Sequence, residues 1–298
     1  MKIIGYPSMP LWTQELAQNF NHEIIPACFE FYPNEELSVS LKRDQVSCQT
    51  ILITYSPQKN INASFFELLL VIHTVKALEP QSINLVLPYY LYGRQDSPLG
   101  QNSPAHFILK MLKGAGIDSL ITIDIHNKNI FKQAPFKTFS LTAAPLFSQE
   151  IINYKTKPLI VSPDQGGINR AKALANILKT DYIHLEKKRM LDKRLTLYSS
   201  FKQFKGRYCI IIDDIIDSGS TLSLTADYLI EQGAYQVEAF VTHGIFSQNA
   251  LENINTPSLL RLTITDTLLL RKSVYFHPKI KVVKIAPFLG DILKKLHG

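Results

Sequence analysis

The stretch Arg207–Thr221, RYCIIIDDIIDSGST, decides the fold of this chain. Its first part, Tyr208 to Ile212, is an apolar, β-rich run, which predicts a strand buried on both faces of a parallel sheet. We expect the strand to end at Asp213 and Asp214. Small residues follow, and then LSLTADYLIEQGA, which has helical spacing. In open parallel sheets, ligands bind beyond the carboxyl ends of the strands, so this segment is a candidate ligand site.

The residue types of this segment predict which ligand it binds. Ser218, Gly219, Ser220 and Thr221 are small, so backbone N–H groups can approach a phosphate, and the start of the following helix adds positive potential. The nearby carboxylates can accept hydrogen bonds from sugar hydroxyls or hold Mg²⁺. The sequence therefore predicts a site for a phosphorylated sugar and a metal. An ordinary strand-loop-helix turn with solvated acids is the alternative, but it does not explain three acids and four small residues in one short segment.

Length and composition exclude several classes of protein. The 298 residues suffice for two α/β domains, and 46% hydrophobic with 19% charged residues is ordinary for a globular protein. The three cysteines are far apart, which argues against a disulfide framework and favours a reducing compartment such as the cytoplasm. The chain starts MKIIGYPSMP, without the apolar core of a signal peptide, and we expect no membrane span. The net charge of +7 suits phosphorylated small molecules, and no nucleic-acid-binding motif is present.

Further polar groups follow other expected strands. The segment PYYLYGRQD at 88–96 brings Arg94, Gln95 and Asp96 together; by itself this triplet is equally consistent with a surface ion pair and with a phosphate or base site. Asp124 and His126 follow another strand, although a lone histidine is usually structural. The segment SPDQGG at 162–167 places an acid and two glycines before a helix, and EKKRMLDKR at 186–194 is a basic run, usually a solvated face.

The stretch 213–221 resembles the phosphoribosyl-diphosphate loop of type I phosphoribosyltransferases and of ribose-phosphate diphosphokinases. Those loops have two acids, two apolar residues and then Asp-Thr-Gly-Gly-Thr, so Ser220 in place of glycine is a mild departure. PYYxYxRQD is specific to the diphosphokinases, and Asp-Ile-His, Ser-Pro-Asp-x-Gly-Gly and THGIFSQNALENI also match that family in order. The resemblance therefore covers nearly the whole chain, and a Lys-x-Arg loop of the family corresponds to Lys187 and Arg189, which Arg194 would assist.

The resemblance implies an α/β fold with two tandem type I phosphoribosyltransferase-like domains, each a mainly parallel sheet flanked by helices. Alternation of strands with helices of 10–15 residues independently predicts parallel α/β architecture. The expected domains are 1–141, on the ATP side, and 142–298, on the ribose 5-phosphate side, with the terminal helix 287–298 packed on the first domain.

The implied reaction transfers the diphosphoryl group of ATP to the 1-hydroxyl of ribose 5-phosphate, with Mg²⁺, and gives phosphoribosyl diphosphate and AMP. The resemblance implies Lys187 and Arg189 as catalytic residues and His126 and Asp164 as metal ligands. The implied ATP-binding residues are Tyr32, Asn34, Glu36, Arg94, Gln95 and Asp96. The implied ribose 5-phosphate-binding residues are Asp213, Asp214, Asp217, Ser218, Gly219, Ser220 and Thr221.

Two departures from the family pattern affect the nucleotide and the effectors. The family's Phe-Pro-Asp-Gly-Glu, at the adenine site, is here Tyr-Pro-Asn-Glu-Glu at 32–36, which puts a strict preference for adenine in question. After Asp96 the chain reads SPLG, without the basic residues that regulated members use near their phosphate effector site.

In this family a neighbouring subunit completes the adenine site, so the resemblance implies a homo-oligomer, dimer-based and up to a hexamer. Two other functions remain open. A nucleotide-salvage phosphoribosyltransferase shares the loop 213–221 but does not explain Arg94–Asp96, Asp124–His126 or the second α/β unit. A non-catalytic regulatory relative is expected to have lost the loop lysine or the acids, which this chain retains.

Overall fold

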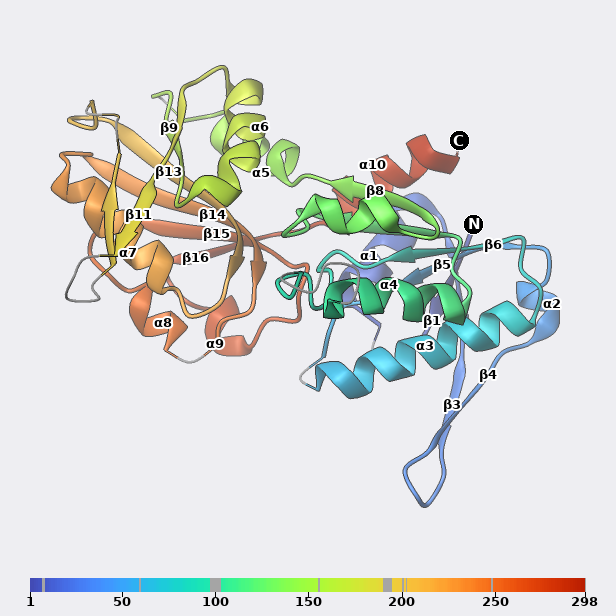
Figure 1. Cartoon of the computed structure of the whole chain (residues 1–298). Helices are drawn as coiled ribbons and strands as arrows, with labels where there is room; N and C mark the ends of the chain where they lie inside the picture. The colour runs from blue at the N-terminus through green and yellow to red at the C-terminus, as the bar shows by residue number, and fades with distance from the viewer. Residues whose placement is uncertain are drawn as a thin grey trace. The chain divides into compact units, whose positions relative to one another are not determined.

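A computed structural model describes residues 1–6, 9–58, 60–96, 103–154, 156–189, 195–199, 201, 203–247 and 249–297 (Figure 1). The chain divides into two compact units, Met1–Leu141 with Ile285–Gly298, and Thr142–Lys284. Each unit contains a six-stranded sheet in which all neighbouring strands are parallel. The predicted fold class, α/β with two mainly parallel sheets flanked by helices, is confirmed. No helix in the described part of the chain is both long and apolar enough to cross a bilayer.

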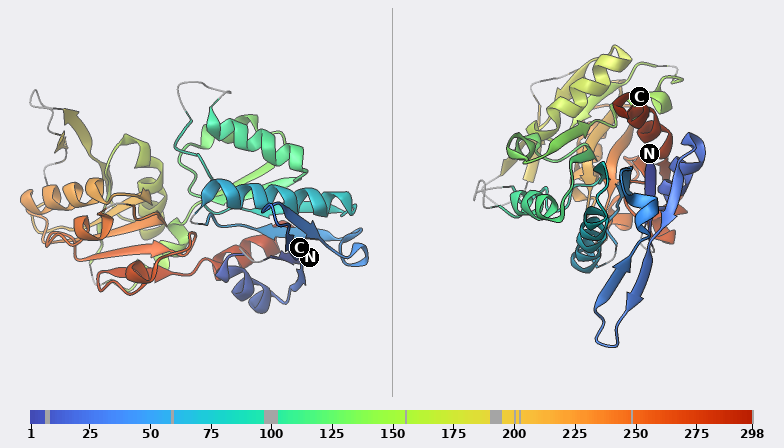
Figure 2. Two further views of the ribbon diagram at one scale, coloured as in Figure 1. Left: turned by 90° about the horizontal axis from the view of Figure 1, so that it is seen from below. Right: turned by 90° about the vertical axis from the view of Figure 1, so that its right-hand side faces the viewer.

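The sheet of the first unit has the strand order β2-β1-β5-β6-β7-β8. Its strands are β1 (Lys2–Gly5), β2 (Glu23–Pro26), β5 (Thr50–Thr54), β6 (Ser82–Val86), β7 (Ser119–Ile123) and β8 (Lys137–Leu141). Helices α3 and α4 cover one face, and α1 and α10 cover the other (Figure 2). The helices of this unit are α1 (Leu11–Phe20), α2 (Arg43–Val46), α3 (Ile61–Ala77), α4 (Pro104–Ala115), the 3₁₀ helix η2 (Lys128–Gln133) and α10 (Ala286–His297).

Local sequence signals set the ends of the two long helices. The side chain of Asn60 accepts a hydrogen bond from the backbone N–H of Ala63, at 3.2 Å, and so caps α3. Helix α4 has Pro104 in its first turn, where no N–H donor is needed, and ends at Gly116 with φ +114°. The terminal helix α10 packs on α1 at Gly290, where a Cβ atom would lie 1.9 Å from the ring of Phe20. The last helix of the chain therefore completes the first unit.

An antiparallel hairpin projects from the first unit (Figure 1). It consists of β3 (Cys28–Phe31) and β4 (Leu37–Ser40). The alternation of Leu37, Val39 and Leu41 with polar residues predicts a strand at 36–41, but residues 31–36 by themselves predict only a turn, so β3 is not predicted. The turn is closed by the N–H of Tyr32, which donates to the carbonyl of Glu36 at 2.9 Å. Glu35 has φ +67°, the left-handed conformation that favours the glycine of the family pattern.

The sheet of the second unit has the order β10-β9-β13-β14-β15-β16. Its strands are β9 (Leu159–Ser162), β10 (Tyr182–His184), β13 (Tyr208–Ile216), β14 (Gln236–Gly244), β15 (Arg261–Thr265) and β16 (Ile280–Val283). Helices α5 (Ala144–Ile151) and α6 (Ile168–Leu178) lie on one face (Figure 1). The short 3₁₀ helix η3 (Gln165–Gly167) precedes α6, and the helices of the other face are α7 (Ser220–Glu231), α8 (Ala250–Asn253) and α9 (Lys272–Tyr275).

Two elements of this unit differ from the sequence-based expectation. Strand β13 does not end at Asp213 and Asp214, because its pairing with β14 continues through Asp213↔Val241 to Ile216↔Gly244. The acids therefore lie in the strand, beyond the part of β13 that pairs with β9. The basic run starting at Glu186 is not only a solvated face: β11 (Glu186–Arg189) pairs antiparallel with β12 (Leu195–Tyr198).

Candidate functional site

The paired acids of β13 are held by an arginine of α6. Arg170 Nη2 lies 3.1 Å from Asp214 Oδ1 and 3.5 Å from Asp213 Oδ1. The Asp214 side chain is almost fully buried, whereas the Asp213 side chain is 23% exposed. Asp213 is therefore the acid of this pair that a ligand can reach, and Asp214 lies beneath it.

The environment of Asp213 disfavours its negative charge. Burial and the adjacent Asp214 carboxylate raise the pKa of Asp213 to about 8, while Arg170 opposes that rise. The backbone N–H of Asp214 also donates to Asp213 Oδ1, at 2.9 Å. A bound cation or a set of hydroxyl donors would favour the ionised form of Asp213, which then accepts hydrogen bonds.

The small-residue loop follows directly after β13. Gly219 caps the N-terminus of α7 with φ +76°, a conformation that glycine adopts without steric cost. The hydroxyls of Ser218 and Ser220 lie 2.9 Å apart, and the N–H of Ser220 lies 3.4 Å from Ser218 Oγ. The Asp217 carboxylate accepts a hydrogen bond from the hydroxyl of Ser247. Backbone N–H groups, hydroxyls and the start of a 12-residue helix thus converge, as binding of a phosphate requires.

Asp164 lies at the carboxyl end of β9, the strand next to β13 in the sheet. Its Oδ1 accepts from the N–H of Gly167 at 3.3 Å, and its carbonyl accepts from the Ser162 hydroxyl at 2.7 Å. A Cβ atom at Gly167 would lie 2.3 Å from Ser162 Oγ, so a side chain there would displace the Ser162 hydroxyl. Neighbouring parallel strands end at the same edge of a sheet, so Asp164 and the loop after β13 share one edge.

In the first unit, two separate motifs are joined by a hydrogen bond. Asn127 Nδ2 donates to Asp96 Oδ2 at 2.6 Å, and Asn127 Oδ1 accepts from the N–H of Asn129 at 2.9 Å. The segment 94–96 after β6 is thereby linked to the segment 124–127 after β7. Asp124 has φ +42°, an uncommon conformation for a residue other than glycine, which is frequent in binding and catalytic segments.

The three hairpin residues of the predicted adenine site lie at an exposed tip. Tyr32 is 57% exposed. Asn34 Oδ1 accepts a hydrogen bond from the N–H of Glu36 at 3.3 Å. The Nδ2H₂ group of the same amide therefore points away from the Glu36 backbone. Figures 1 and 2 show this tip well apart from the carboxyl end of β6. The hairpin that carries Tyr32 and Asn34 therefore projects away from the end of the strand that precedes the segment 94–96.

The predicted loop cations Lys187 and Arg189 lie on strand β11. Positions 187 and 189 are two residues apart on β11, so they lie on one face of the hairpin, and position 188 lies on the other. Arg194 and Ser97–Gly100 lie outside the described residues. His126 belongs to the first unit and Asp164 to the second, so each is placed only within its own unit.

Within the second unit, the structure brings the predicted residues of 213–221 and Asp164 to one sheet edge. Within the first, it brings 94–96 and 124–127 together. Sequence reasoning missed the side chains that hold these groups, because each contact joins segments distant in the chain. The missed residues are Arg170, Asn127, Ser247 and Asn253.

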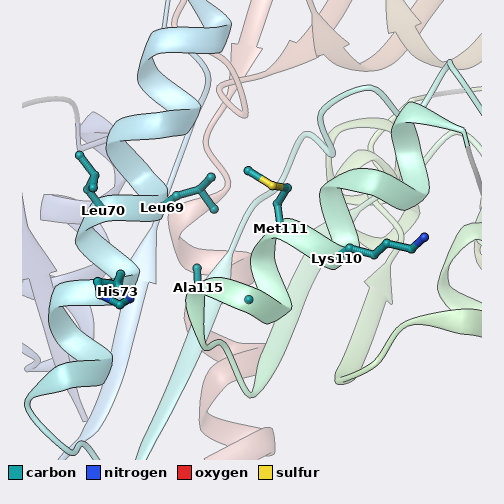
Figure 3. A pocket seen from close by; sticks show the side chains of 7 residues that line it. Leu69, Leu70, His73, Lys110, Met111 and Ala115 are labelled. Atoms are coloured by element: carbon teal, nitrogen blue, oxygen red, sulfur yellow. The ribbon is translucent and has the colours of Figure 1, made fainter.

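An apolar groove of about 390 Å³ lies elsewhere, between α3 and α4 (Figure 3). Leu69, Leu70 and His73 of α3 line it together with Lys110, Met111 and the end of α4. The end of α4 leads into the start of β7, so the groove lies toward the amino ends of the strands. It has no part in the polar site after β6 and β7.

The structure supplies oxygen ligands for a metal but no complete protein cage. Among the described residues, no three histidine, cysteine, aspartate or glutamate side chains gather closely enough to hold an ion. Mg²⁺ is usually bound by one or two carboxylates together with substrate phosphates and water. The acids at the carboxyl edge of the second sheet fit that type of coordination, in which the substrate supplies most of the oxygens.

Two parallel sheets, with a phosphate-type loop at the carboxyl edge of one of them, define an α/β protein of type I phosphoribosyltransferase-like architecture. Residues 1–116 match the N-terminal domain of ribose phosphate pyrophosphokinase, and residues 198–298 match the phosphoribosyl synthetase-associated domain. The crystal structure of phosphoribosylpyrophosphate synthetase from Mycobacterium smegmatis has the same fold, with a TM-score of 0.87 and 24% identity over 99% of this chain and 98% of that one.

Curated relatives match over the full length. A ribose-phosphate pyrophosphokinase 1 of Streptococcus pneumoniae is 30% identical over 100% of this chain and 94% of that protein. A ribose-phosphate pyrophosphokinase of Bradyrhizobium diazoefficiens is 31% identical over 99% of this chain and 94% of that protein. This chain belongs to the ribose-phosphate pyrophosphokinase family, of which about 30% identity makes it a divergent member. Enzymes of this family are diphosphotransferases of nucleotide biosynthesis that use a metal ion.

Proposed function

We propose that this protein transfers the diphosphoryl group of ATP to the 1-hydroxyl of ribose 5-phosphate, giving phosphoribosyl diphosphate and AMP. The observation that carries the proposal is the acid pair of β13 followed by the small-residue loop at the start of α7. This arrangement offers acceptors for sugar hydroxyls and donors for a phosphate side by side. The full-length relation to the family supports the second substrate, ATP.

In this proposal the second unit holds ribose 5-phosphate. The 5-phosphate binds at Ser218–Thr221, and Asp213 accepts hydrogen bonds from the 2- and 3-hydroxyls. Asp214 holds Arg170 and so keeps Asp213 in place. Asp217 orients the sugar. Each role follows from the position of the group relative to the start of α7.

The first unit addresses ATP, through Arg94, Gln95 and Asp96, and Asn127 fixes the Asp96 carboxylate. We propose Mg²⁺ as the metal ion, with Asp164 and His126 as the residues that bind it or its waters. The ion would neutralise charge on the transferred phosphates. Lys187 and Arg189 close over the phosphates and stabilise the charge that develops during transfer.

The three free cysteines are consistent with a reducing compartment, and we place the reaction in the cytoplasm.

A phosphoribosyltransferase is the main rival, because it uses the same loop. Such an enzyme consumes phosphoribosyl diphosphate and needs a base as its second substrate. Incubating the purified protein with ATP and ribose 5-phosphate, without any base, distinguishes the two. Release of AMP supports the diphosphokinase. A non-catalytic relative would bind the substrates and release none.

We further propose a homo-oligomer in which the hairpin of one copy completes the ATP site of another. The exposed Phe31 and Tyr32 support this, since they are 70% and 57% exposed on a hairpin that projects away from the carboxyl end of β6 in its own unit. An aromatic side chain can stack on a base, and a guanidinium can pair with phosphate. The two groups thus address different parts of one nucleotide.

Mixing two inactive variants tests this proposal. Tyr32→Ala and Arg94→Ala should each have little activity as a pure oligomer. In a mixed symmetric dimer, one site carries both lesions and the other carries neither, so random mixing should leave about a quarter of all sites intact. We expect the co-refolded protein to be more active than either variant alone, because about a quarter of its sites are intact. No gain in a sample shown to contain mixed oligomers would exclude a shared site.

Asn34 should broaden the choice of nucleotide. Because its Oδ1 accepts from Glu36, the amide Nδ2H₂ is the group available to a base, and it can donate to the carbonyl oxygen of guanine. An aspartate there would present a second acceptor, which favours the amine of adenine. We expect Asn34→Asp to raise the ratio of kcat/KM for ATP over GTP about 5- to 150-fold, the effect of leaving one buried polar group unpaired. An unchanged ratio would show that Asn34 does not contact the base.

A further inference from the structure

The phosphate loop of the second unit rests on a separate segment, residues 245–247 and 249–253, which follows β14. None of the predicted site residues lies in this segment. Its backbone is joined to the end of β13: the N–H of Ile245 donates to the carbonyl of Ile216 at 2.9 Å, and the N–H of Ser247 donates to the carbonyl of Asp217 at 3.0 Å. The segment therefore runs directly beside the loop.

Two side chains of this segment hold two consecutive residues of the loop. The hydroxyl of Ser247 donates to the Asp217 carboxylate, which fixes the orientation of that carboxylate. Asn253 Nδ2 donates to the carbonyl of Ser218 at 2.8 Å. Both contacts are partly buried, so water competes for them less than at an open surface.

The contact of Asn253 has a consequence for the backbone of the loop. In a trans peptide, the carbonyl and the following N–H point in opposite directions. With the Ser218 carbonyl held toward α8, the N–H of Gly219 is directed away from α8. That N–H belongs to the first residue of the helix start at which a phosphate binds. Asn253 thus sets the direction of a phosphate-binding donor that it does not itself carry.

The packing beneath the loop leaves little space for another arrangement. A Cβ atom at Gly219 would lie 3.2 Å from the carbonyl oxygen of Ala250 and 3.3 Å from Ile254 Cγ2. Phe246 is buried at 1% exposure and has φ +52°, which is a genuine outlier for a bulky residue. Arg271 donates to its carbonyl. A strained conformation persists where surrounding contacts fix it, and such positions cluster at ligand-binding segments.

We propose that Ser247 and Asn253 are positioning residues that hold the loop 217–219 in the shape that binds the 5-phosphate and the sugar. The proposal rests on the assignment of this loop to ribose 5-phosphate. Neither side chain needs to touch the substrate. Without them, the loop would have to be ordered at the moment of binding, and that cost would reduce affinity.

The test compares steady-state kinetics of four variants with wild type. We expect Ser247→Ala to raise the KM for ribose 5-phosphate about 10- to 100-fold, since it removes a hydrogen bond to a charged group. Asn253→Ala removes a neutral bond and should raise that KM about two- to tenfold. The KM for ATP should stay at the wild-type value, and kcat should fall less than the KM for ribose 5-phosphate rises. Ser247→Thr keeps the hydroxyl and should restore affinity. Asn249→Ala, an exposed change in the same segment, is the matched control.

Calorimetric titration of ribose 5-phosphate into each variant gives the same comparison without turnover. A purely structural role would lower the midpoint of thermal unfolding and raise both KM values together, and that result would overturn the proposal. An unchanged KM for ribose 5-phosphate in Ser247→Ala and Asn253→Ala would also overturn it. If wild type itself released no AMP and bound no ribose 5-phosphate, the proposed function would fail instead, so the two failures are distinguishable.

Discussion

Lys187→Ala and Arg189→Ala are each expected to lower turnover about 10²–10³-fold while leaving the affinity for ribose 5-phosphate close to that of wild type. Diphosphoryl transfer concentrates negative charge on the phosphates in the transition state, and the protein contributes mainly position and opposite charge. Cations that approach only when the loop closes act on the transition state more than on the bound substrate. They therefore change kcat more than they change binding.

The chain offers a matched control for this prediction. Lys188 lies between the two residues and, by the register of β11 with β12, on the other face of the strand. Lys188→Ala removes the same charge from the same hairpin and should keep kcat close to wild type. If all three variants lost activity equally, the effect would come from the net charge of the hairpin. If Lys187→Ala and Arg189→Ala both turned over within a few-fold of wild type, these residues would have no catalytic role.

Asp213→Asn should weaken binding of ribose 5-phosphate about 10- to 100-fold, because a carboxylate that accepts sugar hydroxyls becomes an amide of the same shape. Its stability should change little, since the substitution also removes the repulsion between Asp213 and the adjacent Asp214 carboxylate. Asp214→Asn should weaken binding as well, but through Arg170. With residue 214 neutral, the buried guanidinium keeps, of its two carboxylate partners, only the more distant Asp213, at 3.5 Å.

The free energy of unfolding should distinguish the two substitutions. We expect Asp214→Asn to lower the free energy of unfolding by about 1–3 kcal/mol, the cost of leaving a buried polar group poorly paired. Calorimetry in Mg²⁺ gives the affinities, and urea unfolding gives the stabilities. Asp181→Asn is the control, because it removes the carboxylate of an exposed ion pair with Arg207. Asp181 and Arg207 precede β10 and β13, so this pair lies at the amino ends of the strands of the same sheet. Unchanged affinity for sugar and metal in both variants of the acid pair would contradict the assignment.

The sequence predicted the parts of the fold that depend on local pattern. The apolar run at Tyr208–Ile212 became a central strand of a parallel sheet, and the small residues after it became the start of α7. The end of β13 could not be predicted, because Asp213 and Ile215 pair with a neighbouring strand whose length the run itself does not reveal. The hairpin β11–β12 was missed for a related reason. Its basic residues resemble a solvated run until the partner strand Leu195–Tyr198 is placed beside them.

In the candidate site, too, residues within one motif could be predicted from the sequence, whereas contacts between distant segments could not. Residues within one motif, such as Asp213 and Asp217, are visible in the sequence because their spacing carries the chemistry. Arg170 reaches Asp214 from 44 positions away, and Asn127 reaches Asp96 from 31 positions away. Such contacts follow from the order of strands in a sheet. Neither residue type is unusual in its own segment, so no local pattern marks it.

The identity of the products is the most direct test of the proposed reaction. Phosphorus NMR of the purified protein with equal amounts of ATP and ribose 5-phosphate, in Mg²⁺ and without any base, follows every phosphate at once. We predict that AMP and ribose 5-phosphate 1-diphosphate appear in equal amounts, with no ADP and no free pyrophosphate. Formation of ADP would indicate transfer of a single phosphoryl group, and AMP with free pyrophosphate would indicate hydrolysis. Either result, or no AMP at all, would contradict the proposed diphosphoryl transfer.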